Sequence, residues 1–158
     1  MKTLLINIFL AFAWIFLTGD LAFINFAQGM VIAYIVLYIA RGVHTSEAYF
    51  TKLPTIISFI FYFMKELIVA NFMVAYDIIT PEHKMRPAII AFPLTAESAI
   101  EITILANLIT LTPGTLSIDV SESRKVLYIH TMYLKSTPEQ FVEEIRNGLE
   151  KKLLEVTR

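Results

Sequence analysis

The N-terminal apolar stretch is the feature that most limits what this chain can fold into. From Thr3 to Ala40 the only charged residue is Asp20. Two apolar runs, residues 3–18 and 21–40, are separated by Gly19 and Asp20, a pair typical of turns. A membrane-spanning helix needs ~20 residues, with ~17 as the lower end, so the first run is short and the second is adequate. The pattern predicts a hairpin of two antiparallel transmembrane helices.

The composition supports a membrane protein and excludes some other classes. Apolar residues make up 56% of the 158 residues and charged residues 17%, whereas soluble domains carry ~45–50% and ~25%. The net charge of −1 gives no sign of a nucleic-acid partner, and the absence of cysteine excludes disulfides and thiolate metal sites. We therefore expect an integral membrane protein with residues 1–41 as the hairpin and the lipid bilayer as a partner.

Positive charges at the two ends of the hairpin indicate its orientation. Lys2 and Arg41 lie on the same side of the membrane if the two helices are antiparallel. Lys and Arg flanks favour the cytoplasm, so we expect both ends to be cytoplasmic. Asn25 and Gln28 lie on the second span, where we expect them to pack or form hydrogen bonds with a neighbouring helix. An ion ligand is the alternative role for these two residues.

The next segment, residues 42–80, combines a polar connector with a third apolar helix. We expect this helix over residues 54–79, because proline suits the first helical turn. Lys65 and Glu66 lie at its middle, and they share one narrow polar stripe with Asp77.

Two interpretations of this amphipathic helix stay open. It lies in the cytoplasmic interface with the stripe toward water, or it crosses the membrane with the stripe against protein partners. In the second case an intramembrane Lys-Glu pair would itself indicate function. A lysine at the centre of a span costs ~2.5–3.5 kcal/mol on an insertion scale. We favour the interfacial interpretation, which needs no third crossing to leave the C-terminal domain in the cytoplasm.

Residues 81–158 change to a pattern of short elements. The predicted elements are an edge strand bounded by prolines (87–94), a helix (96–110) capped by Thr95 with Glu97 in its first turn, two strands of a hairpin (116–120 and 126–134) and a last helix. The whole chain is therefore expected to be a membrane α-helical hairpin plus an amphipathic helix, followed by a small α+β (β-α-β-β-α) cytoplasmic domain.

The last helix carries the clearest local signals. Thr137 and Gln140 have the spacing of a capping box, and Pro138 occupies the first helical position. Four apolar residues recur every four positions and predict one stripe that packs on the sheet. They are Phe141, Ile145, Leu149 and Leu153.

The sequence offers little to an enzyme. It contains no phosphate-binding loop, no nucleophile elbow and no zinc spacing, so we expect neither a cofactor nor a metal site. His44 and His83 lie in polar connectors, where a solvated histidine is the ordinary interpretation. Asp119 and His130 lie on partner strands, and a cross-strand contact between them would more often be structural than catalytic.

The segment Asn107–Leu116, of sequence NLITLTPGTL, is the most distinctive stretch of the chain. It has the pattern of a helix end, a Pro-Gly turn and a strand start. The hydroxyls of three threonines can satisfy backbone groups freed at the helix terminus, and this structural interpretation is favoured. The alternative is a docking edge for a partner subunit. The residues concerned are Asn107, Thr110, Thr112, Pro113, Gly114 and Thr115.

This segment also carries a family resemblance. Together with residues 117–121 (SIDVS) and 127–130 (LYIH), it resembles the E subunit of the Mrp-type multisubunit sodium/proton antiporter. The N-terminal hairpin, the segment around Lys65 and Glu66, and the entry into the domain at Arg86 fit the same pattern, so the resemblance covers nearly the whole chain.

The resemblance implies an accessory, non-enzymatic subunit of a hetero-oligomeric complex in a bacterial or archaeal inner membrane. Such a complex exchanges cytoplasmic sodium for external protons, its large subunits are thought to carry most of the ion path, and its other subunits would be the partners of this chain. Two alternatives remain. One is a membrane-anchored interaction module of an unrelated complex, such as a respiratory or secretion assembly. The other is a membrane-bound enzyme that uses Asp119 and His130.

Overall fold

The computed structural model describes residues 2–40, 47–81, 85–134 and 137–158. The chain divides into two compact units, Met1–Thr55 and Ile56–Arg158. Arg41, His44 and His83, which enter the predictions above, lie outside the described residues.

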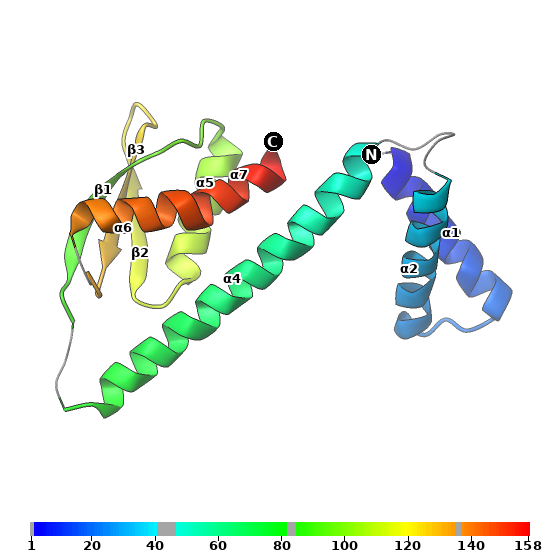
Figure 1. Cartoon of the computed structure of the whole chain (residues 1–158), viewed down its shortest axis with the longest axis horizontal. Coiled ribbons are helices and arrows are strands. Elements are labelled where there is room, and N and C mark those ends of the chain that lie inside the picture. The colour runs from blue at the N-terminus through cyan, green and yellow to red at the C-terminus, as the bar shows by residue number, and fades with distance from the viewer. Residues whose placement is uncertain (1, 41–46, 82–84, 135–136) are drawn as a thin grey trace. The chain divides into compact units, whose positions relative to one another are not determined.

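The first unit contains a helical hairpin. Helices α1 (Lys2–Thr18) and α2 (Phe23–Ile39) pack against each other (Figure 1). The turn between them uses Gly19 at φ 69°, a backbone conformation that glycine adopts without steric cost. One carboxylate oxygen of Asp20 accepts a hydrogen bond from the backbone N–H of Ala22 at 2.9 Å. The two predicted helices and the turn between them are therefore present.

Small and polar side chains fill the interface between α1 and α2. On both helices the buried residues recur every four positions, so each helix presents one stripe to the other. The stripes are Thr3, Asn7, Ala11 and Ile15 on α1, and Asn25, Gly29, Ala33 and Leu37 on α2. Small residues allow the two backbones to approach closely. A Cβ added to Gly29 would lie 3.1 Å from the carbonyl oxygen of Ala11.

Helix α4 (Glu47–Ile79) begins seven residues before Pro54, so the predicted start at this proline is wrong. Pro54 has no N–H for the carbonyl four residues earlier, and this costs helix stability. Aromatic contacts favour the extra turns, because Phe50 is buried and lies 5.3 Å, ring centre to ring centre, from Tyr34 of α2. Residues 47–53, predicted as connector, are therefore helical.

The second unit contains a three-stranded antiparallel sheet in the order β1-β3-β2. The strands are β1 (Ala88–Pro93), β2 (Thr115–Val120) and β3 (Val126–Thr131). The predicted edge position of the first strand and the predicted hairpin of the other two are confirmed. A register shift between Ser117 and Asp119 interrupts the pairing of β2 with β3.

Helix α5 (Ala99–Leu111) is capped by Ser98, not by Thr95 as predicted. Ser98 and Glu101 form a reciprocal capping box, which satisfies two backbone donors at once. Thr95 has no acidic or amide residue three positions later, so it cannot form such a pair. The predicted place of Glu97 in the first turn is wrong for the same reason.

The last predicted helix is interrupted by a wider turn. Helix α6 (Pro138–Ile145) continues through a π-helical turn (Arg146–Glu150) into α7 (Lys151–Thr157). Thr137 caps α6, accepting the backbone N–H of Gln140 at 3.4 Å. A spacing of four exceeds the ~3.6 residues of one α-helical turn, so a stripe with this spacing drifts around the helix. One wider turn corrects the drift and keeps Leu149 and Leu153 in the core.

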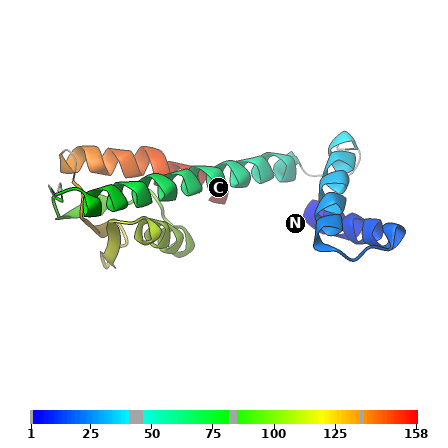
Figure 2. The same ribbon diagram turned by 90° about the horizontal axis from the view of Figure 1, so that it is seen from below.

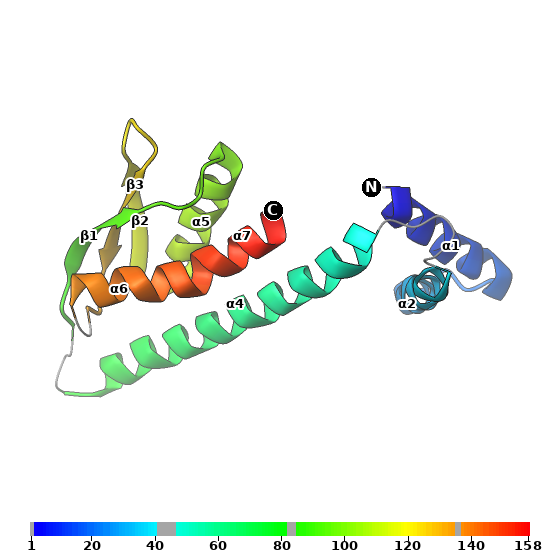
Figure 3. The same cartoon turned by 45° about the horizontal axis from the view of Figure 1, so that its top comes forward.

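One hydrophobic core joins the sheet to its helices. It contains Phe92, Leu105, Ile109, Leu127, Ile129, Leu149 and Leu153, which come from β1, α5, β3 and the C-terminal helices. Phe59, Tyr62 and Phe63 of α4 pack against it. In Figures 1 and 3, the green part of α4 runs below the sheet and below α6 and α7, and Figure 2 shows α6 and α4 side by side. The C-terminal part of α4 therefore belongs to the α+β unit.

Candidate functional site

The hydroxyls of the Asn107–Leu116 run tie the end of α5 to β2. The Thr110 hydroxyl donates to the carbonyl of Ala106 at 2.9 Å and accepts the backbone N–H of Ser117 at 3.1 Å. The Ser117 hydroxyl donates to the same carbonyl of Ala106 at 2.9 Å. The two bonds of Ser117 hold the strand against the helix that precedes it.

The turn itself is closed by the next two threonines. The Thr112 hydroxyl donates to the carbonyl of Leu108 at 3.1 Å. The Thr115 hydroxyl lies 2.5 Å from the carbonyl of Ile109, one of the acceptors that a helix end leaves open. Gly114, which follows Pro113 in the turn, has a φ of 90°, and a Cβ there would lie 2.9 Å from the ring of Tyr133. Glycine is therefore required at this position by both conformation and space.

Asn107 differs from the threonines of the run. Its side chain is exposed on α5, close to the exposed Ile104 and Leu111. The hydrogen bonds of the threonines agree with the structural interpretation, in which their hydroxyls satisfy backbone groups at the end of the helix. A docking role for the run stays a prediction, and Asn107 and Thr110 are the polar members of the run that are exposed.

The side chains of the predicted polar stripe of α4 point in two different directions. Lys65 is exposed, whereas Glu66 is half-buried. Asp77 is buried, and one of its carboxylate oxygens accepts the Tyr133 hydroxyl at 3.3 Å. Burial and the negative charge of Asp77 raise the pKa of Tyr133. Glu66 and Asp77 therefore face the α+β domain, and Lys65 does not.

A cavity of about 220 Å³ lies where this helix meets the domain. Tyr62, Glu66 and Met73 of α4 line one side, and residues 112–115 with Tyr133 line another. Two groups of residues that the sequence singled out separately, the motif and the polar stripe, therefore meet at one place. Glu144 of α6 also lines the cavity and is exposed.

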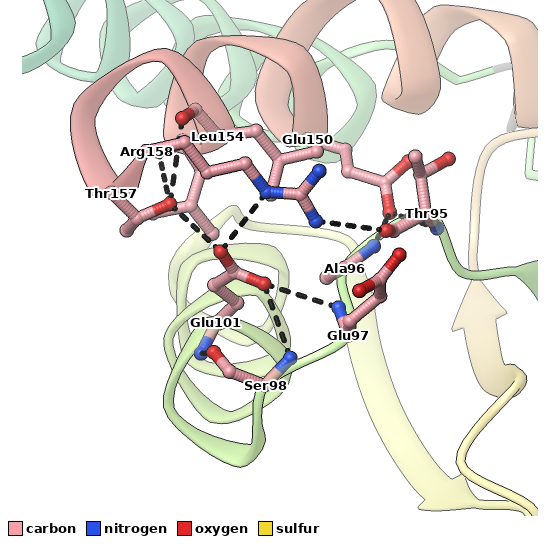
Figure 4. Close-up of polar contacts among 10 residues, drawn as sticks. Thr95, Ala96, Glu97, Ser98, Glu101, Glu150, Leu154, Thr157 and Arg158 are labelled. Atoms are coloured by element: carbon pink, nitrogen blue, oxygen red, sulfur yellow. Dashed lines mark hydrogen bonds and ion pairs between the residues drawn. The ribbon is translucent and has the colours of Figure 1, made fainter.

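The C-terminal end of the chain is fastened to the start of α5 (Figure 4). One carboxylate oxygen of Glu101 accepts the backbone N–H groups of Glu97 and Ser98 at 3.1 and 3.2 Å. The other lies 3.4 Å from the Arg158 guanidinium and 3.2 Å from the Thr157 hydroxyl. The backbone hydrogen bonds of Ser98 and Glu97, aided by Arg158 and Thr157, lower the pKa of Glu101 to about 2.

Glu150 is the most deeply buried acid of this region, with 1% of its surface exposed. One of its carboxylate oxygens accepts the backbone N–H groups of Thr95 and Ala96, at 2.6 and 3.0 Å (Figure 4). The π-helical turn ends at Glu150, so the wider turn places this acid against the loop that enters α5. These bonds also explain why residues 95 and 96 lie outside the helix.

The structure does not bring Asp119 and His130 together. Asp119 pairs with Tyr128, and His130 lies opposite Leu116 on one side and Ile89 on the other. The two residues are therefore not cross-strand partners, because Asp119 lies opposite Tyr128, two positions before His130 on β3. Among the residues that the structure describes, no group of three or more His, Asp or Glu side chains could hold a metal ion.

Comparisons with known proteins identify the family. The protein-family model described as "Na+/H+ ion antiporter subunit" matches residues 7–156 of the chain. The chain belongs to this family. The E subunit of the Na+/H+ antiporter of Bacillus subtilis (strain 168) is 40% identical over 155 residues, which cover 98% of each protein. The resemblance noted in the sequence is confirmed.

Two solved structures share the fold at moderate identity. A chain in the Mrp complex from Dietzia sp. DQ12-45-1b has a TM-score of 0.51 and 28% identity, covering 65% of this chain and 96% of that one. A chain in the membrane-bound sulfane sulfur reductase, an archaeal respiratory membrane complex, has a TM-score of 0.57 and 29% identity, covering 96% of both. Chains of this fold therefore occur both in an Mrp complex and in a respiratory membrane complex.

Sequence reasoning missed Tyr133, Glu144 and Glu150. Tyr133 follows a strand, and its place beside Gly114 depends on the pairing of β3 with β2. Glu150 follows Leu149 of the apolar stripe, and a helical projection that allowed a wider turn would have placed it near the core. No local signal distinguishes Glu144 from its exposed neighbour Glu143.

Proposed function

We propose that this chain is an accessory subunit of a multisubunit Na+/H+ antiporter complex in a bacterial or archaeal plasma membrane. The near full-length similarity to the E subunit of an antiporter, at 40% identity, is the observation that carries the proposal. The partners are the other subunits of the complex and the lipid bilayer. Sodium ions and protons are the substrates of the complex as a whole.

The interior of the hairpin supports an accessory role. The residues buried in α1 and α2 include no ionisable side chain. A proton relay through a membrane needs titratable groups along its path, and an ion path needs polar ligands around a cavity. This chain therefore supports assembly and coupling, and the ion path lies mainly in other subunits.

Helices α1 and α2 are the membrane anchors in this proposal. Each has 17 residues, about 26 Å at ~1.5 Å per residue, against a hydrocarbon core of ~30 Å. A mismatch of this size costs little, because the bilayer thins locally and flanking residues reach the interface. The positive charges of Lys2 and Arg41 favour the cytoplasm for both ends of the hairpin. The chain is then a multi-pass protein with a cytoplasmic C-terminal domain.

The C-terminal part of α4 lies along the membrane surface in this arrangement. By length and composition the helix, over Ala48–Ile79, is long and apolar enough to span a bilayer. However, its contacts with the domain run from Phe59 to Asp77, a length of about 27 Å at ~1.5 Å per residue. A crossing helix would therefore take the domain into the hydrocarbon, together with its charged residues and its sheet edges. The opposite face of the helix exposes Phe61 and Phe72, at 72% and 73%, and suits the lipid interface.

Depth measurements test this placement directly. Phe61 and Ile68 are exposed and lie seven positions apart on nearly the same face of α4, about 10 Å along the helix. The chain has no cysteine, so Phe61→Cys and Ile68→Cys each give a single site for a nitroxide label. Power-saturation EPR in proteoliposomes should place both labels at one depth. Labels at Ile24→Cys and Val31→Cys of α2, also seven apart, are the spanning control. Val31 lies at the middle of α2 and Ile24 near its end, so these two labels should differ in depth. A comparable difference in α4 would contradict the surface placement.

Purification of the tagged chain from native membrane in mild detergent tests the complex. Mass spectrometry should find large, many-spanning antiporter subunits with it. The second candidate, a subunit of a respiratory membrane complex, is favoured by the similarity to a chain of the sulfane sulfur reductase. Recovery of reductase subunits in place of antiporter subunits would support that candidate and reject the first.

A further inference from the structure

The cavity between α4 and the α+β domain has the chemistry of a binding site. Its volume of about 220 Å³ is below the usual range of ~300–1,000 Å³ for drug-sized ligands, so its occupant is small. Val69, Ala70 and Met73 of α4 and Ile145 and Leu149 of the C-terminal helices form an apolar wall. An aliphatic group would fill this part of the cavity.

One wall of the cavity carries a negative charge. Glu66 is half-buried, and its carboxylate has no hydrogen-bond or ion-pair partner within the described parts of the chain. Tyr62 lies one helical turn before it and also faces the cavity. The carboxylate oxygens of Glu66 are not among the fully buried polar atoms, so a cation that enters the cavity from solvent can reach them.

The remaining polar groups add no positive charge. Glu144 contributes a second carboxylate, and neither lysine, arginine nor histidine is among the described residues that line the cavity. The hydroxyls of Thr112 and Thr115 are already bonded to backbone carbonyls. An anion would meet two carboxylates and no basic group, so the lining excludes phosphates and carboxylates.

We propose that this cavity binds an aliphatic ammonium group, with the alkyl stem against the apolar wall and the cation at Glu66. A small free amine has this chemistry, and so does the lysine side chain of a partner subunit. The site is independent of the antiporter assignment, because it depends only on contacts within residues 56–158.

Methyl NMR on the full chain in detergent micelles tests the site. The chain has six methionines, and Met73 lines the cavity, whereas Met64 of the same helix does not line it and is 47% exposed. With 13C-methyl methionine, n-butylammonium should shift the Met73 signal saturably and leave Met64 unchanged. The anion n-butyrate should give no saturable shift, and the neutral n-butanol should bind more weakly.

Two matched variants test whether binding depends on the charge of Glu66 or on the loss of any carboxylate. Glu66→Gln removes the carboxylate and should weaken n-butylammonium about tenfold, since a charge-assisted hydrogen bond is lost. Glu143→Gln removes an exposed acid outside the cavity and should leave the affinity unchanged. No saturable shift of Met73, equal binding of n-butylammonium and n-butyrate, or equal affinity of the Glu66→Gln variant would each overturn the proposal.

Carbodiimide coupling in the purified complex distinguishes the two sources of the amine. The reagent joins a carboxylate to an amine in contact with it. A cross-link between Glu66 and a lysine of a partner subunit, found by mass spectrometry, assigns the cavity to that lysine. A butylamide on Glu66, formed when n-butylamine is added, assigns it to a free amine. Modification of the exposed Glu143 without any modification of Glu66 would overturn the proposal in the complex.

Discussion

The hairpin and the α+β domain distribute their side chains in opposite ways. The domain buries large apolar residues, with Phe92 and Ile129 fully buried. The hairpin buries small and polar residues such as Ala11 and Asn25, and it exposes Phe16 at 79%. Phenylalanine is thus a core residue at Phe92 of the domain and a surface residue at Phe16 of the hairpin.

This contrast agrees with the proposed placement of the hairpin in lipid and of the domain in water. A water-soluble domain gains stability by removing large apolar side chains from water. Helices in lipid gain nothing from that, because the lipid is as apolar as the side chain, and they associate through close backbone approach and hydrogen bonds. The two units can therefore be told apart by what damages them.

Deleting a large side chain gives the largest expected difference. Phe92→Ala should lower the free energy of unfolding of the α+β domain by about 3–5 kcal/mol, because it leaves a cavity in a close-packed core. Phe16→Ala in α1 should change stability by less than about 0.5 kcal/mol, as an exposed position does. Pulse proteolysis of the full chain in detergent over a urea gradient measures both. A similar loss for the two variants would remove the contrast.

Adding a side chain, in contrast, should destabilise the hairpin, because its two helices are packed closely through small residues. Gly29 lies against Trp14, and a Cβ there would be 3.0 Å from the indole ring. Gly29→Val should therefore separate α1 from α2 and cost about 1–3 kcal/mol. Trp14 is the only tryptophan of the chain, so its emission reports on the hairpin alone and should shift on substitution.

Gln28→Val is the control for this effect. Gln28 precedes Gly29 and is exposed, so the same new side chain there meets no neighbouring helix. Its emission spectrum and stability should match those of the unmodified chain. An equal shift in both variants would mean that valine disturbs α2 itself and not its contact with α1.

The periodicity of the sequence predicted the elements better than their ends. Strands, hairpins and the stripe through Leu149 and Leu153 follow from local patterns, because period and turn residues are written in adjacent positions. The start of α4 does not follow, since it depends on Phe50 meeting α2. The π-helical turn ending at Glu150 also depends on a distant loop, which supplies two N–H groups to the acid.

The candidate site was predictable only as separate pieces. The threonine run and the pair Lys65 and Glu66 each stand out in the sequence, but nothing local says that Glu66 and Thr112 line one cavity. The pair itself separates, because adjacent helical positions differ by ~100° and only Glu66 faces the domain. Tyr133 joins the site through strand pairing, which a single sequence does not reveal.

Removing a buried polar side chain from the hairpin should destabilise it less than the Gly29→Val substitution does. Asn25 accepts the Trp14 indole N–H at 2.9 Å and donates toward the Thr18 hydroxyl and the Asp20 carbonyl, each at 2.6 Å. Interhelical hydrogen bonds in membranes contribute about 0.6 kcal/mol on average and up to ~1.7. Asn25→Ala should therefore destabilise the hairpin by about 1 kcal/mol, measured by Trp14 emission during SDS titration. Gln28→Ala, which removes an exposed amide, should give no change.

Acid should lower the stability of the α+β domain but not that of the hairpin, and near neutral pH neither should change. Glu101 has a folded-state pKa of about 2, below its ordinary value near 4.5, because backbone N–H groups, Arg158 and Thr157 favour its charged form. The same kind of bonding lowers the pKa of Glu139. A lowered pKa stabilises the fold above the unfolded-state value, and this contribution is lost as the pH falls from about 4.5 toward 2. Between pH 6 and 8 these groups should leave stability unchanged.

The hairpin should not follow this dependence, because the buried residues of α1 and α2 include no ionisable group. Far-UV CD and Trp14 emission, recorded together from pH 7 to pH 2, should show the domain losing stability to urea while the hairpin signal stays constant. Glu101→Gln should flatten part of the acid transition, with Glu143→Gln as the exposed control that leaves it in place. A hairpin signal that changed together with the domain would show that the two units do not respond to acid independently.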